Sequence, residues 1–158
     1  YLQVKLGGDQ AVLKGVMKCL LAKGAVDEKF IAEKTDGFDT LRESLSGIEW
    51  DAIVEQSGIS RADIEKLGDL VASSERIIAC WAMGLTQQKH AVATIQDVGN
   101  VILMRGSVGK PGAGLCPVRG HSNVQGDRTM GINERAPDWF LDAVDREFGI
   151  TCPREHGF

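Results

Sequence analysis

The chain has 158 residues, a net charge of -4, 43% apolar residues and 25% charged residues. This length is typical of one domain that buries a substantial core, and the acidic balance disfavours general nucleic-acid binding. The sequence has no apolar run of about 18 residues that would span a bilayer, and the N-terminus lacks a basic region followed by an apolar one. We therefore expect a soluble, cytoplasmic protein.

The cysteines at positions 19, 80, 116 and 152 are widely spaced, with no C-x-x-C pair and no histidine at zinc-ligand spacing. The sequence therefore predicts no metal site. Cys19 and Cys80 lie in apolar contexts and are expected to be buried, as small hydrophobic residues in a reducing compartment. The chain begins at Tyr1 without a methionine, and its last residues up to Phe158 form no predicted helix or strand. Both features favour a piece of a longer protein.

The first segments predict a strand, a glycine turn and a helix. Apolar and polar residues alternate over residues 2–6, Gly7-Gly8-Asp9 follows, and apolar residues then recur at helical spacing over residues 12–21. In α/β folds such a turn lies where helix N–H groups hold an anion or a carboxylate takes a ribose hydroxyl. Asp9 is either an ordinary helix N-cap or a residue that recognises a sugar or base.

The middle of the chain predicts helices that serve as packing elements. Asp27 is expected to cap a short helix, residues 39–45 to form another, and Trp50 to belong to an apolar stripe. Ser60 is the predicted N-cap of the clearest helix, with Asp63 at the capping-box position.

A second strand, turn and helix follow. Residues 76–83 form a nearly continuous apolar run, typical of a buried parallel strand, and residues 91–104 have the pattern of a largely buried helix. Together the two units predict a three-layer, Rossmann-like α/β fold with few parallel strands flanked by helices, as one domain over residues 1–158. Two strands alone are marginal, so we expect self-association through an exposed edge.

Residues 104–128 are rich in glycine and leave no room for an amphipathic helix or an alternating strand, so they predict a long ordered loop. The basic residues there are Arg105, Lys110, Arg119 and Arg128. They either bind an anionic ligand or cap helix ends and pair with surface carboxylates. No dinucleotide fingerprint or P-loop is present.

Three polar residues of this loop suit recognition of a nucleotide-like ligand. His121 is expected to orient a ligand, with acid–base chemistry as the second role, while Asn123 and Gln125 suit the edge of a pterin or guanine. Downstream, a final helix is predicted from Pro137, and His156 is expected at the surface.

At these residues the sequence resembles the alpha subunit of the molybdopterin oxidoreductases, in the formate dehydrogenase-like branch. The matching segments are Gly8-Asp9, Met83-Gly84-Leu85-Thr86-Gln87 and the run GSVGKPGAGLCPVRGHSNVQGDRTMG over residues 106–131. The last is the specific one, and the match covers nearly all of this chain but a minor part of such a subunit.

The resemblance implies a bis(molybdopterin guanine dinucleotide) cofactor with molybdenum or tungsten, held by several domains of one subunit. Gly8 and Asp9 would lie near a guanine nucleotide, and Met83, Gly84 and Gln87 would touch the dinucleotide. The pterin end would be lined by Arg119, His121, Asn123, Gln125 and Gly126, with Arg119 orienting the substrate. The metal-ligating residue and any [4Fe-4S] ligands would lie outside this chain, which alone would be inactive.

Formate dehydrogenases usually carry glutamine where this chain has His121, and the histidine-containing sequence resembles the less characterised formate dehydrogenase-like oxidoreductases. The expected partners are the remaining domains, a small-molecule substrate such as formate, and an electron-transfer protein, without nucleic acid or a membrane span. Two alternatives remain: a non-catalytic nucleotide- or pterin-binding α/β module, and a purely structural domain.

Overall fold

The computed structural model describes residues 1–133 and 135–155. It divides into two compact units, Tyr1–Val118 and Arg119–Phe158, and each unit is described by itself. This division does not test the prediction of a single domain over residues 1–158, which stays a prediction. The expectation for His156 lies outside the described residues.

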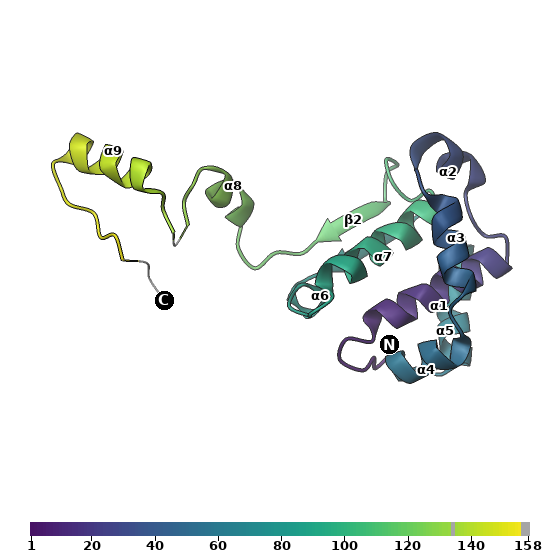
Figure 1. Ribbon diagram of the computed structural model, residues 1–158. Coiled ribbons are helices and arrows are strands. Elements are labelled where there is room, and N and C mark those ends of the chain that lie inside the picture. The colour runs from purple at the N-terminus through teal and green to yellow at the C-terminus, as the bar shows by residue number, and fades with distance from the viewer. Residues whose placement is uncertain (134, 156–158) are drawn as a thin grey trace. The chain divides into compact units, whose positions relative to one another are not determined.

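The first unit is a helical core joined to a small parallel sheet (Figure 1). Its elements are α1 (Asp9–Ala22), α2 (Glu28–Lys34), α3 (Phe38–Ser46), α4 (Trp50–Ser57), α5 (Arg61–Ser73), β1 (Ile78–Trp81), α6 (Met83–Thr86), α7 (Ala91–Met104) and β2 (Gly114–Pro117). Helix α1 is central because it packs against α3, α4, α5 and α7. As its spacing predicted, Val16, Met17 and Leu20 are almost fully buried.

Local side-chain caps set the starts of two helices, as the sequence predicted. The Phe30 N–H donates to Asp27 Oδ1 at 2.9 Å before α2, and the Asp63 N–H donates to Ser60 Oγ at 3.2 Å before α5. The Ser60 hydroxyl also donates to the Asp63 carboxylate at 2.7 Å. Each cap satisfies one of the donors that a helix leaves unpaired at its first turn.

The strand predicted over residues 2–6 is wrong. The segment has no strand structure. Lys5 ties it to the end of α4, because its backbone N–H donates to the Ser57 carbonyl oxygen and its Nζ donates to the Glu55 carbonyl oxygen, both at 2.9 Å. Leu2 and Val4 pack against the helical core while Leu6 is exposed. The alternation therefore reflects packing of an extended segment on helices, not pairing in a sheet.

The sheet consists of β1 and β2, which pair in parallel with Ile78 opposite Gly114 and Trp81 opposite Pro117. Helices α6 and α7 make the crossover, and α7 packs against both strands. The predicted α/β class, with few parallel strands flanked by helices, is confirmed. Burial of the strand is not: Ile78 and Cys80 are exposed and alternate with half-buried residues. Cys80 was therefore predicted wrongly as buried, whereas Cys19 is buried as expected.

The glycine-rich segment is ordered but contains regular elements that its composition did not predict. Residues 114–117 form β2, which pairs with β1 through backbone groups, and α8 (Val124–Thr129) belongs to the second unit. The second unit also contains α9 (Asp138–Phe148), the predicted final helix. Arg154 ties the following segment to α9 through Asp145 at 2.6 Å and Asp142 at 2.9 Å. None of the helices in the described residues is long and apolar enough to cross a membrane.

Candidate functional site

The turn before α1 needs its two glycines for two different reasons. Gly7 has a φ of +81°, which L side chains rarely adopt. Gly8 has ordinary dihedral angles, but a Cβ there would lie 2.7 Å from the Gln56 carbonyl oxygen and 2.8 Å from Ser57 Cα. Close packing against the end of α4 is thus a structural reason for Gly8, and no local sequence pattern indicated it.

Asp9 is the first residue of α1 and does not cap it. Gly8 occupies the N-cap position, and the helix has no side-chain cap. The N-cap interpretation of Asp9 is therefore wrong by one residue. The Asp9 carboxylate instead accepts a hydrogen bond from Gln88 Nε2 at 3.2 Å, across 79 positions of sequence.

Gln88 joins the two segments that the sequence marked separately. Its amide nitrogen donates to the Asp9 carboxylate and, at 2.7 Å, to the Gly84 carbonyl oxygen. Gln87 is the residue predicted from the sequence, and no local signal indicates Gln88, because two adjacent glutamines cannot be told apart without the fold. Gln87 is exposed, and its Nε2 contacts Met83 Sδ at 3.7 Å. We call Gly8, Asp9, Met83, Gly84, Gln87 and Gln88 the first group.

The second group lies in the second unit and comprises Arg119, His121, Asn123, Gln125 and Gly126. Asn123 is the N-cap of α8, since its Oδ1 accepts from the Gly126 N–H at 3.1 Å. Gly126 leaves room for this cap, because a Cβ there would collide with the Asn123 side chain. The Arg119 guanidinium donates to Gln125 Oε1 at 2.6 Å, so these two predicted residues are brought together.

The second group presents mainly donors. Asn123 and Gln125 use their carbonyl oxygens for the contacts above, which leaves both –NH₂ groups without a partner in the described chain. Arg119 contributes further N–H groups and a positive charge. His121, two residues further along the chain, is exposed. Such a surface suits an anion or a ligand rich in acceptors.

Among the basic residues of the glycine-rich segment, Arg105 has a structural role in place of the alternative role of anion binding. Arg105 donates to the carbonyl oxygens of Ala25 at 2.7 Å and Ser74 at 3.0 Å, so it ties loops together at the end of α5. A cavity of about 790 Å³ is lined by residues of α1, α3, α4 and α5 and by none of either group. Within residues 1–133 and 135–155, no three His, Cys, Asp or Glu side chains gather as metal ligands.

Comparison with known proteins gives relatives over the whole chain, although no family profile matches it. The chain is 50% identical over 164 residues to an uncharacterized oxidoreductase of Mycobacterium tuberculosis, covering 100% of this chain and 21% of that protein. It is 36% identical over 165 residues to a Staphylococcus aureus protein named "Putative formate dehydrogenase", covering 99% of this chain and 17% of that protein.

Among solved structures, acetylene hydratase from Pelobacter acetylenicus has a similar fold, with a TM-score of 0.65 at 21% identity over 69% of this chain and 15% of that chain. The chain therefore spans about a fifth of the length of the curated relatives it matches.

Proposed function

We propose that this chain, which is homologous to one segment of the formate dehydrogenase-like oxidoreductases, binds part of a bis(molybdopterin guanine dinucleotide) cofactor in a longer catalytic subunit. The observation that carries the proposal is the Gln88 bridge, which brings Asp9 and Gly84 from separate segments to one place. The rest of the subunit, in a cytoplasmic enzyme, completes the cofactor site and supplies the metal ligand.

The first group suits a guanine base. A carboxylate accepts hydrogen bonds only, and the Watson–Crick edge of guanine offers two donors, its N1–H and its N2 amino group. A phosphate would be repelled by Asp9, although the N-terminus of α1 alone would favour an anion. Gly84 has no atom within 4 Å of where a Cβ would stand, so a flat ligand can approach its backbone.

The second group suits the pterin end of the cofactor. Arg119, Asn123 and Gln125 together offer N–H donors and one positive charge, which match the oxygens of a pterin and an anionic substrate. When bound, the metal–pterin group supplies the exchange of two electrons with the substrate. Arg119 then orients a small anion such as formate, and Gln125 holds the guanidinium in place.

The test uses a full-length subunit that contains this chain, with metal and guanine nucleotide measured after purification. Asp9→Ala removes the acceptor of a charge-assisted bond worth about 1.5–3 kcal/mol, so cofactor retention is expected to fall at least tenfold under dilution. Asp51→Ala is the matched control, because Asp51, like Asp9, is an acidic residue in the first turn of a helix, and it lies outside both groups.

Arg119→Ala is expected to lower turnover far more than metal content, because the proposed role of Arg119 is to position substrate. Arg146→Ala, which removes an exposed arginine of α9, is its control and is expected to retain turnover. Gln125→Ala is expected to weaken both properties, since it frees Arg119. Wild-type metal content and turnover in the Asp9, Arg119 and Gln125 variants would contradict the proposal and favour a non-catalytic module.

A further inference from the structure

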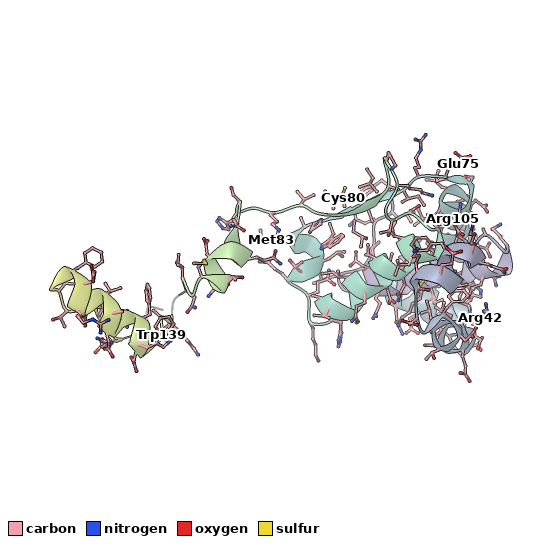
Figure 2. The ribbon with its side chains drawn as sticks, turned by 90° about the horizontal axis from the view of Figure 1, so that it is seen from above. Arg42, Glu75, Cys80, Met83, Arg105 and Trp139 are labelled. Atoms are coloured by element: carbon pink, nitrogen blue, oxygen red, sulfur yellow. The ribbon has the colours of Figure 1, made fainter. Side chains whose placement is uncertain are left out.

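Two of the four cysteines lie opposite each other on the two adjacent strands of the sheet. Cys80 on β1 and Cys116 on β2 are register partners in the parallel pair, and both are exposed (Figure 2 labels Cys80). The proposed cofactor chemistry uses neither residue. Cys19, by contrast, is buried in the helical core, and Cys152 lies in the other unit, where its N–H donates to Asp145.

The spacing of adjacent strands suits a bond between these two thiols. Register partners on neighbouring strands have Cα atoms separated by roughly 4.7–4.9 Å, and disulfides form across Cα separations of about 4.4–6.8 Å. The side chains of register partners also leave the sheet on the same face. Ile78, two residues before Cys80 on that face, is exposed as well, so small reagents can reach the pair.

The Cys116 side chain lies close enough to affect the ionisation of Cys80. Desolvation raises the pKa of the Cys80 thiol above its ordinary value, and a hydrogen bond with Cys116 raises this pKa further. Proximity of the sulfurs therefore has support beyond the backbone register. The chain also leaves β1 directly into Ala82 and α6, so a bond at Cys80 would anchor the segment that carries Met83 and Gly84.

We propose that Cys80 and Cys116 form a dithiol site that closes to a disulfide by exchange with a small-molecule disulfide. One cysteine thiolate attacks a sulfur of the reagent and releases one small thiol, which leaves a mixed disulfide. The other cysteine thiolate then attacks the protein sulfur of that mixed disulfide and releases the second small thiol. Two electrons pass from the cysteines to the reagent, and the two thiol protons end on the released thiols at neutral pH.

The test incubates the 158-residue chain with glutathione disulfide and maps the products by mass spectrometry after alkylation. The expected product has lost two hydrogen atoms and carries a peptide that links Cys80 to Cys116. Cys80→Ser and Cys116→Ser should each stop at a mixed disulfide on the remaining cysteine. Closure should become faster with rising pH, because the raised pKa of Cys80 keeps that thiol protonated at neutral pH.

Cys19 is the internal control for folding, since a buried thiol is alkylated only when the chain unfolds. With Cys19 protected, stable mixed disulfides on both Cys80 and Cys116 without closure would overturn the proposal. A link from either residue to Cys152 instead would overturn it equally. This outcome is independent of cofactor binding, because the chain carries the site without the rest of the subunit.

Discussion

Gly8 and Gly84 are both proposed cofactor contacts, but the structure predicts opposite effects when each is replaced by alanine. A Cβ on Gly8 would come within 2.7–3.1 Å of three backbone atoms, from Gln56, Ser57 and Lys5. Backbone cannot move aside as a flexible side chain can, and overpacking of this kind costs about 1–3 kcal/mol. Displacing Lys5 would also weaken its bond to the Ser57 carbonyl, so we expect a loss of about 2–3 kcal/mol for Gly8→Ala.

The control is Gly84→Ala, because the site has open space and lies in the helical α6. Alanine there is expected to change the free energy of unfolding by at most about 1 kcal/mol, in the stabilising direction. Urea denaturation of both variants, followed by circular dichroism, measures the difference. If Gly8→Ala were as stable as the wild type, Gly8 would not be packed against α4, and a ligand contact would have to explain the glycine.

Two further predictions concern Gln88 and Asp145. Gln88→Ala should lower guanine nucleotide retention in the full-length subunit, because Gln88 bridges Asp9 and Gly84. The control Gln96→Ala, at an exposed glutamine of α7 outside both groups, should not, and equal retention in both variants would refute the bridge. Hydrogen bonds from Cys152, chiefly the one from its side chain, hold the pKa of Asp145 below its usual value of about 4. A lowered pKa gives stability that is present above the unfolded pKa and is lost as pH falls through the folded one. Hydrogen exchange at the Cys152 amide should therefore lose protection below about pH 4 in the wild type, and unchanged protection would contradict this; Asp145→Asn should remove the pH dependence.

The predictable parts of the fold were those set by neighbouring residues. Ser60 and Asp27 cap helices because their side chains reach N–H groups three residues ahead, a distance that the sequence itself encodes. The helical spacing of α1 likewise indicated its buried face. These features depend on local geometry, so they could be predicted before any tertiary contact was known.

The parts that could not be predicted depend on distant partners. β2 has no alternating pattern and contains a proline, and it becomes a strand only by pairing with β1. Residues 2–6 have the alternation but no partner strand. In the site, Gly8 and Gln88 owe their roles to α4 and to Asp9, contacts that no local pattern reveals.

The central claim is that these residues help to hold a metal–pterin guanine dinucleotide, and metal and nucleotide analysis of the purified full-length subunit tests it most directly. We expect molybdenum or tungsten together with guanine nucleotide released by mild acid, and loss of both in Asp9→Ala but not in Asp51→Ala. A full-length protein that is folded and carries neither metal nor guanine nucleotide would contradict it.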